Sequence, residues 1–340
     1  MSKQWTNMER ITADNFITDN RTDKVYISSL LNTVSGNLDK EIRSKLKGDI
    51  LKYGGSNGSL LLNTRDVWVR DYMPIQLTKD VFLSYTYKPD YLLDKPDYIT
   101  NWQLHNVHPA DVRDKELFSK FKVVQIPMIL DGGNVIKAVV KGKPCFIMCK
   151  KVIEENNVSD DDFYDWWNCW WKENFDNTEM ELVLLPWEGE KYNPIGHADG
   201  IVRYIEEDRV LLTNYEDFDN RFFPASLFID KLEEAGFEVE TLSYKKQFDY
   251  NNDKLFRMLF KHSWCYINYL QVGNSILVPS LGYKALDNEA LRQIDAAFNR
   301  KKHIAEIRVI DVDMTSIVED MNDETNSGGA LNCLTWTIKI

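Results

Sequence analysis

The stretch "TNSGGALNCLTW", residues 325–336, places Cys333 behind two glycines near the end of the chain. It is the last of five short polar motifs, and the other four are "VRDYMP" with Asp71, "LDGGN" with Asp131, "GHADG" with His197 and "YINYL" with Asn268. These five marker residues follow one another at intervals of 60, 66, 71 and 65 residues. Repeats of similar length, each with strands and part of a helix, indicate a closed circular array. The spacing therefore predicts that the five motifs meet near a central axis.

The segments between the motifs alternate between strand-like and helix-like patterns. Short runs rich in β-branched and aromatic residues predict strands, among them 59–71, 122–130, 200–205, 263–272 and 275–280. Helical spacing with polar starts predicts helices over 37–55, 159–175, 224–237 and 288–300. The fold class expected from this alternation is α/β.

One of these predicted helices, 159–175, carries an aromatic stripe. Trp166, Trp167, Trp170 and Trp171 fall at i, i+1, i+4 and i+5, so they share one helix face. We expect this face to pack on the core or on another subunit, and we give it no chemical role.

The chain has no linker-like or low-complexity segment, so we expect one domain over residues 1–340. Roughly the first 20 residues are expected to lie at its periphery, as chain termini commonly do.

Composition excludes several classes of function. The formal net charge of −12 argues against nucleic-acid binding, which needs clustered Lys and Arg. No apolar run is long enough to span a membrane, and the first residues contain no apolar signal-peptide core. The five cysteines are an odd number, which favours reduced thiols over a disulfide framework. We therefore expect a cytoplasmic protein that binds neither nucleic acid nor membrane.

The motifs hold several side chains that could carry chemistry, each with an ordinary structural alternative. His197 and Asp199 are two residues apart, which in a strand places both on one face, although a surface hydrogen-bonded pair has the same pattern. Asp66 and Asp71 flank Trp68 in a strand-like run, where acids are rare. Ion pairs with Arg65 and Arg70 would also explain these two acids.

Metal and cofactor sites are not indicated. Cys145 and Cys149 are four residues apart with no histidine near them, which is a poor zinc pattern. The glycine-rich segment "GGSNG" lacks the Lys-Ser/Thr of a phosphate-binding loop. We expect neither a metal nor a cofactor.

The remaining candidates are Cys333, His197 and the acids Asp71, Asp131 and Asp199. Cys333 could simply be a small buried hydrophobe, since cysteine is among the most buried residue types. A thiol combined with an imidazole, however, suggests covalent catalysis. Carboxylates around a thiol suit a substrate whose electrophilic carbon is already cationic, and guanidinium is such a group.

The five motifs in this order, "DVWVRDYMP", "LDGGN", "GHADGIVRYI", "YINYLQVGNSILVPSLG" and "GGALNC", resemble the agmatine deiminase family and its relative, the Porphyromonas-type peptidylarginine deiminase. The similarity runs from about residue 60 to the C-terminus. It implies the pentein fold, a five-bladed α/β propeller with pseudo-fivefold repeats and an active site on the axis.

The resemblance also implies roles for individual residues. Cys333 matches the nucleophile, His197 the general acid/base, and Asp71 and Asp199 the acids that hold the guanidinium. Asp131 falls where the family usually has a glutamate, and we expect it to orient and charge His197.

Four further residues are expected to bind substrate, namely Trp68, Asn268, Gly329 and Asn332. Asn268 falls on a family asparagine, whereas Asn332 stands where the family usually has a histidine. The family's N-terminal W-E-P-H-type segment is absent, so the agmatine pocket is expected to differ in part.

The implied function is the hydrolysis of a small cationic guanidino compound, with agmatine as the leading candidate and N-carbamoylputrescine and ammonia as products. A peptidyl- or free-arginine deiminase, an amidinotransferase and a non-catalytic pentein binding protein are the alternatives, and a Cys-His peptidase is a more distant one. The oligomeric state stays open, with a homodimer as one option.

Overall fold

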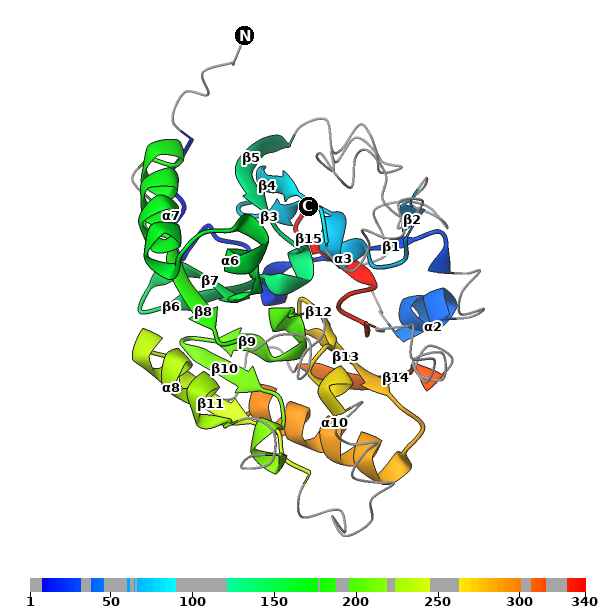
Figure 1. Ribbon diagram of the computed structural model, residues 1–340. Coiled ribbons are helices and arrows are strands. Elements are labelled where there is room, and N and C mark those ends of the chain that lie inside the picture. Colours follow the sequence, from blue (N-terminus) through cyan, green and yellow to red (C-terminus); the bar gives the residue numbers. More distant parts are fainter. Residues whose placement is uncertain are drawn as a thin grey trace.

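Five small sheets of three strands each are arranged in sequence order around the molecule (Figure 1). The computed structural model describes residues 8–31, 38–45, 60–61, 64, 66–89, 121–176, 178–187, 196–218, 224–244, 263–300, 307–315 and 329–340. Within these ranges the fold is a five-bladed α/β propeller, which confirms the fold class predicted from the motif spacing.

Each blade has the same strand pattern, which the second blade shows most completely. Strand β6 (Ile136–Val140) pairs antiparallel with β7 (Lys143–Cys149), and β7 pairs parallel with β8 (Glu181–Leu185). A parallel pair needs a crossover connection, and here α6 (Lys151–Asn156) and α7 (Asp160–Asn174) provide it. The unit that repeats is therefore two antiparallel strands, a helical crossover and a third strand.

Three other blades repeat the strand pattern, and the third and fourth also show the helical crossover within the described residues. The first blade comprises β3 (Ile75–Gln76), β4 (Val81–Thr86) and β5 (Lys122–Ile129). The third blade comprises β9 (Val202–Glu206), β10 (Arg209–Leu212), α8 (Ser226–Ala235) and β11 (Glu238–Thr241). The fourth blade comprises β12 (Leu270–Val272), β13 (Ser275–Ser280), α10 (Lys284–Phe298) and β14 (Arg308–Asp313). Short helical turns η1 (Asp19–Arg21) and η8 (Tyr215–Asp217) complete the elements outside the motifs.

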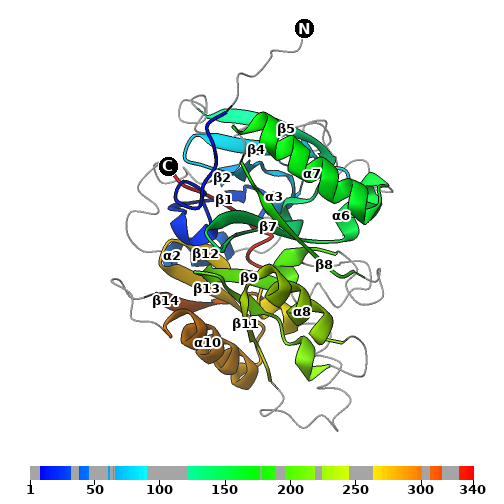
Figure 2. The same cartoon turned by 90° about the vertical axis from the view of Figure 1, so that its left-hand side faces the viewer.

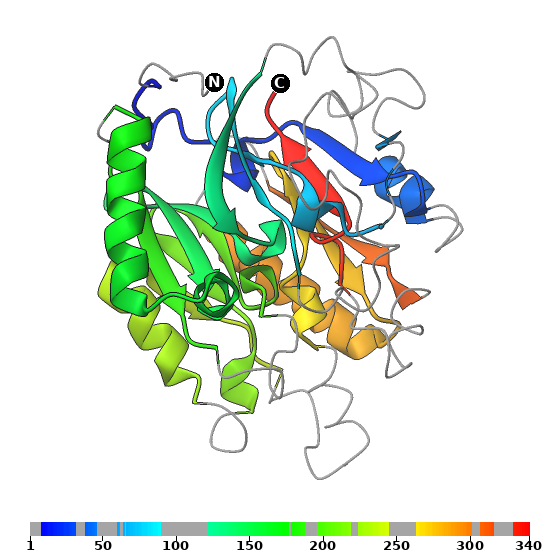
Figure 3. The same ribbon diagram turned by 45° about the horizontal axis from the view of Figure 1, so that its top comes forward.

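The fifth blade joins the two ends of the chain. Its first strand is β15 (Thr335–Ile338), which pairs antiparallel with β1 (Lys24–Ser28) in a register that sets Lys24 opposite Ile338. β1 then pairs parallel with β2 (Leu60–Leu61), and α2 (Leu38–Lys45) lies between them in sequence. Figure 3 shows the C-terminal strand beside β1. This pairing closes the ring.

The five motifs directly precede the first strands of the five blades. The short helix α3 (Val69–Tyr72) precedes β3, η6 (Gly132–Asn134) precedes β6 and η7 (Ala198–Gly200) precedes β9. The turn η10 (Ser263–Tyr266) and Asn268 precede β12, and a turn over 331–334 precedes β15. The predicted meeting of the motifs therefore has a simple cause, since each occupies the same place in its repeat.

Three local predictions were wrong. The run 59–71 ends in helix α3, the pair His197 and Asp199 lies at a helical turn, and 263–266 is a 3-10 turn, where strands were expected. Short apolar runs that are buried on all sides lack the alternation that separates strands from helices. His197 and Asp199 therefore do not share a strand face.

The helices α7, α8 and α10 cover the outside of successive blades (Figure 2). Ser159 caps α7 by accepting a hydrogen bond from Asp162 N at 3.2 Å. The tryptophans of the stripe face the core, with Trp167 and Trp171 fully buried against Phe146. The core-facing role expected for the stripe is confirmed.

The N-terminal residues that the structure describes pack against this core. Met8, Ile11 and Phe16 are buried in the same cluster as the stripe, and Ile11 N donates to Thr178 Oγ1 at 2.8 Å. The single-domain organisation stays a prediction. No helix in the described ranges is both long and apolar enough to cross a membrane.

Replacing Trp167 tests the contribution of the stripe to stability. Trp167 is fully buried and its Nε1 donates to Met180 O at 2.8 Å. We expect Trp167→Ala to lower the free energy of unfolding in urea by about 3–5 kcal/mol, because it leaves a large cavity and an unpaired carbonyl. Trp166→Ala, on the same helix but half-buried, is the matched control and should cost clearly less. Equal losses would contradict the core-facing assignment.

Candidate active site

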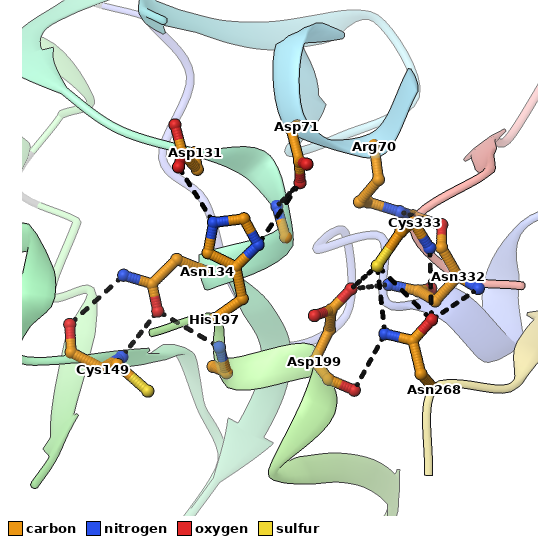
Figure 4. Close-up of polar contacts among 12 residues, drawn as sticks. Arg70, Asp71, Asp131, Asn134, Cys149, His197, Asp199, Asn268, Asn332 and Cys333 are labelled. Carbon is orange, nitrogen blue, oxygen red and sulfur yellow. Dashed lines mark hydrogen bonds and ion pairs between the residues drawn. The ribbon is translucent and has the colours of Figure 1, made fainter. Parts of the chain in front are cut away.

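Five predicted site residues meet in one buried cluster near the axis (Figure 4). Asp71 comes from α3, Asp131 and His197 lie directly before η6 and η7, Asp199 lies within η7, and Cys333 lies in the turn before β15. All five side chains are buried. Four blades therefore contribute to a single site, although the residues are far apart in sequence.

His197 lies between two carboxylates. Its Nε2 is 2.9 Å from Asp131 Oδ2 and its Nδ1 is 3.6 Å from Asp71 Oδ1. Burial alone would lower the pKa of His197, but Asp71, Asp131 and Asp199 outweigh it and raise that pKa to about 9. Although Asp131 is shorter than the family's glutamate, it reaches the imidazole. The ring is therefore held as a proton donor.

Asp71 is fixed by backbone contacts from two directions. Its Oδ1 accepts a hydrogen bond from Gly133 N at 3.0 Å, and its own carbonyl oxygen accepts one from Tyr85 Oη at 2.7 Å. A Cβ on Gly133 would lie 2.5 Å from Asp71 Oδ1 and 2.7 Å from His197 Nδ1. Only glycine fits at this position, because any side chain would separate the acid from the imidazole.

The carboxyl of Asp71 holds a proton more tightly than an exposed acid does. Burial raises its pKa to about 8; His197 lowers that pKa, while Asp131, Asp199 and Asp66 raise it. Three carboxylates and one imidazolium leave the cluster with excess negative charge once all are ionised. A cation entering the cluster would relieve this repulsion.

The thiol of Cys333 faces the same acids. Its Sγ lies 3.4 Å from Asp199 Oδ2 and 3.3 Å from Asn268 Nδ2. Burial raises its pKa well above the ordinary value, and the charges of Asp199 and Asp71 raise it further. Both effects favour the neutral thiol of Cys333 over its thiolate.

Asn268 holds the turn that carries the thiol. Its Oδ1 accepts hydrogen bonds from Asn332 N at 3.0 Å and Cys333 N at 3.3 Å. Its Nδ2 reaches Asp199 O at 3.3 Å. This amide thus joins η7 to the turn before β15, and its contacts are with protein backbone as well as with the sulfur.

Asn332 connects Asp199 of η7 to Arg70 of α3. Its Nδ2 donates to Asp199 Oδ2 at 2.7 Å, and its carbonyl oxygen accepts from Arg70 Nε at 3.3 Å. Its buried Oδ1 meets no hydrogen-bond donor in the part of the chain that the structure describes. An unsatisfied buried acceptor beside the carboxylate of Asp199 is available to an N–H of a ligand.

Trp68 and Gly329 pack directly against the turn over residues 331–334 that carries Cys333. A Cβ on Gly329 would lie 2.6 Å from Trp68 Cζ3 and 2.7 Å from Cys333 Cβ. A side chain at position 329 would therefore collide with Trp68 and Cys333, while Gly328 lies outside the described residues. The substrate contacts expected of Trp68, Asn268, Gly329 and Asn332 stay predictions.

One structural residue of the site was missed at the sequence level. The Oδ1 of Asn134 accepts from Cys149 N at 2.7 Å and from Ala198 N at 3.2 Å, and its Nδ2 donates to Cys149 O at 3.2 Å. It therefore links η6 to the residue that follows His197. The signal was present as the final residue of "LDGGN", where a buried asparagine at a turn suggests backbone capping.

The structure tests the ion-pair explanation for Asp66 and Asp71 in part. Among the described residues, Arg70 has no carboxylate within ion-pair distance, so it does not neutralise Asp66 or Asp71. Arg65 and the other histidines, His105, His108, His262 and His303, lie outside those residues. No group of three or more His, Cys, Asp or Glu in the described ranges is arranged to hold a metal ion.

The acid cluster should lower the free energy of unfolding as the pH rises. A carboxyl with a raised pKa binds its proton more tightly in the folded protein, so the free energy of unfolding falls between about pH 4 and about pH 8. We expect Asp71→Asn to be more stable than the unaltered protein at about pH 8, by about 1–3 kcal/mol, and to show a flatter dependence on pH. Urea unfolding at both pH values measures this.

The matched control is Asp217→Asn, because Asp217 is equally buried but accepts hydrogen bonds from Asn214, Ser243 and Tyr244. That variant should lose stability at both pH values. A loss for Asp71→Asn at about pH 8, with an unchanged pH slope, would show that the cluster is not repulsive.

Comparison with solved structures shows which fold the chain shares with known proteins. Among solved structures it is similar to the C. jejuni agmatine deiminase, with a TM-score of 0.62 and 14% identity over 99% of this chain and 98% of that one. It is also similar to an Enterococcus faecalis agmatine deiminase, with a TM-score of 0.58 and 15% identity over 97% and 98%.

These two similarities establish the fold that the resemblance implied, the pentein propeller. No curated protein sequence matches the chain. The family model for Porphyromonas-type peptidyl-arginine deiminases matches residues 30–338. The match covers most of the chain, which therefore belongs to the Porphyromonas-type peptidyl-arginine deiminase family.

Proposed function

We propose that this protein hydrolyses agmatine to N-carbamoylputrescine and ammonia, with Cys333 as the nucleophile. Its family makes it a guanidine-modifying deiminase, a hydrolase that acts on C–N bonds of amidines. The observation that supports the finer proposal is the thiol of Cys333 and the imidazole of His197 set among three buried carboxylates. A guanidinium is the group that this combination suits.

In the first half-reaction the guanidinium binds between Asp71 and Asp199, its positive charge stabilises the thiolate of Cys333, and the proton of the thiol passes to solvent, where it is taken up by the ammonia released later. The thiolate attacks the guanidino carbon, forming a C–S bond and a tetrahedral adduct. His197 gives its proton to one nitrogen, the C–N bond breaks, and ammonia leaves. The covalent product is a thiouronium on Cys333.

In the second half-reaction His197, now neutral, takes a proton from a water molecule that attacks the thiouronium carbon. The C–S bond then breaks, a ureido product leaves, and the thiol and imidazolium are restored. Asp131 stays bonded to Nε2 of His197 throughout, so the proton moves at Nδ1, on the side of Asp71.

A guanidine without a carboxylate suits the site better than free arginine. Of the two arginines that could receive a carboxylate, Arg203 is buried, ion-paired with Asp19 at 2.9 Å and bonded to Tyr269 O. Arg70 Nε donates to Asn332 O, in the turn that carries Cys333. Agmatine carries an amine in place of the carboxylate, and its two positive charges complement an acidic cluster.

Substrate preference is tested with purified protein and a panel of agmatine, free arginine and a peptide ending in arginine. We expect kcat/KM for agmatine to exceed the others at least tenfold, about 1.4 kcal/mol, which corresponds to one charged contact. Amidine transfer to glycine or ornithine, measured in parallel, should be absent. If arginine or the peptide is preferred by that margin, the agmatine assignment fails while the deiminase chemistry stands.

The nucleophile is tested by Cys333→Ala, which should abolish ammonia release and leave the fold intact, because one small residue replaces another. Cys265→Ala is the matched control, since Cys265 is equally buried in the core and lies outside the cluster. It should retain activity. Ammonia release by the Cys333→Ala protein at the unaltered rate would overturn the assignment.

The need for a bound cation predicts selective labelling. Because the pKa of Cys333 is raised in the free protein, iodoacetamide should modify it slowly. A haloacetamidine carries the cation itself and should modify Cys333 much faster. Cys169 on α7 is exposed and serves as the internal reference for the intrinsic reactivity of both reagents. The same rate ratio at Cys333 and Cys169, measured by peptide mass spectrometry, would refute a cation-dependent thiolate.

A further inference from the structure

The buried side chain of Asn134, the last residue of η6, joins three parts of the chain near the axis (Figure 4). Two backbone N–H groups face one atom of its amide, that of Cys149 at 2.7 Å and that of Ala198 at 3.2 Å, so this atom is the oxygen Oδ1. The nitrogen Nδ2 then donates to Cys149 O at 3.2 Å. Within the described residues Asn134 therefore bonds to backbone alone and not to the thiol or the imidazole.

The bonds to Cys149 continue the ladder of the second blade. β6 pairs with β7 in a register that sets Ile136 opposite Ile147, so the next such pair would be Asn134 with Cys149. In an antiparallel ladder the two residues of a hydrogen-bonded pair exchange both N–H···O bonds. Here the main chain has already turned into η6, and the amide of Asn134 supplies both bonds instead. The end of β7 thereby anchors η6.

The bond to Ala198 N links this anchored turn to η7. Ala198 directly follows His197 in the chain. At the other end, the main-chain N–H of Asn134 donates to Asp131 O at 2.9 Å. One residue thus holds the backbone beside each partner of the 2.9 Å contact between Asp131 Oδ2 and His197 Nε2.

That contact has little else to keep it in place. Among the described residues, His197 is the one hydrogen-bond partner of the Asp131 carboxylate, whose Oδ1 is buried without a donor. Asp71 Oδ1 is 3.6 Å from Nδ1 of the imidazole, which is beyond a good hydrogen bond. Whether the carboxylate and the imidazole meet is therefore set by how η6 and η7 lie against each other.

We propose that Asn134 is a positioning residue, which holds η6 against η7 so that Asp131 stays bonded to Nε2 of His197 and Nδ1 is left to exchange the proton. A carboxylate at one ring nitrogen fixes the tautomer and the orientation of an imidazole. The kinetic consequence rests on the proposed function, whereas the state of the imidazole can be measured without turnover.

The charged groups around His197 supply a measurable signature. Among the described residues, Asp71 of α3, Asp131 before η6 and Asp199 of η7 bear on the imidazole, and Lys151 of α6 packs against the residue that precedes it. Burial lowers the pKa of His197, but the three acids raise it to about 9. Loss of the hydrogen bond to Asp131 should therefore lower this pKa.

The titration of His197 is followed by NMR on the full-length protein with isotope-labelled histidine, and its signal is assigned by its loss in His197→Gln. Asn134→Ala removes all three side-chain bonds of Asn134. We expect it to lower the pKa of His197 by about one unit or more, because Asp131 is no longer kept at hydrogen-bond distance. Asn134→Asp keeps acceptors for both N–H groups, so the pKa should stay at or above that of the unaltered protein.

Turnover of agmatine gives the second readout. Asn134→Ala should lower kcat roughly ten- to a hundredfold, as expected for a residue that orients a functional side chain. KM should change little, because no contact with substrate is lost. The alkaline limb of the kcat profile should move to lower pH together with the pKa of His197, since the imidazolium is the proton donor.

Asn299→Ala is the matched control. Asn299 makes the same two-pronged contact with backbone, because Ile307 N donates to its Oδ1 at 3.3 Å and its Nδ2 donates to Ile307 O at 3.0 Å. It lies at the end of α10 in the fourth blade. Both alanine variants should lower Tm, but Asn299→Ala should leave kcat and the titration of His197 unchanged.

If Asn134→Ala does not fold, Asn134→Ser takes its place, because its hydroxyl keeps a polar atom at the buried position but is too short to reach both N–H groups. The same downward shift is expected. An unchanged pKa of His197 in the folded alanine or serine variant, or an equal shift in Asn299→Ala, would overturn the proposal. If the unaltered protein releases no ammonia from any guanidine, the proposed function fails, and the NMR titration alone decides the role of Asn134.

Discussion

The antiparallel pairing of β15 with β1 is the interaction on which the site depends. Five similar units can surround an axis only if the last strand meets the first, and here the C-terminal strand completes the blade that the N-terminal strand begins. The turn before β15 then occupies the same position as the motifs of the other four blades. This closure places Cys333 against Asp199 and Asn268, which precede strands of different blades.

Within the closed ring, electrostatic repulsion and function are linked. Asp71, Asp131 and Asp199 surround one imidazole and one thiol in a buried region, where burial and then the neighbouring negative charges raise the pKa of both Asp71 and the thiol. The fold tolerates this because backbone N–H groups, such as that of Gly133, hold the carboxylates in place. The guanidinium of the proposed substrate would supply positive charge to this cluster.

A positive charge lies one residue away from Asp71. Asp71 faces the acidic cluster, whereas Arg70 lines a small pocket together with Lys137. The two charges separate because successive residues of the short helix α3 point in different directions. Hydrogen bonds from Arg70 to the carbonyl groups of Asn332 and Cys333 join the two regions.

The sequence by itself determined the α/β class, the fivefold repeat and the identity of the residues that gather at the axis, because regular motif spacing survives in the primary structure. It also indicated the inward face of α7 through helical periodicity. It failed at α3, η7 and η10, since short buried runs lack a distinguishing period. The expected contact of Asp131 with His197 is present, but only the tertiary structure decided that Asp71 lies at the other ring nitrogen, that Asn134 and Asn268 connect the motif turns, and that Arg70 and Lys137 line one pocket. Those contacts join residues about 60 or more positions apart, and their distances are set by how the blades pack around the axis.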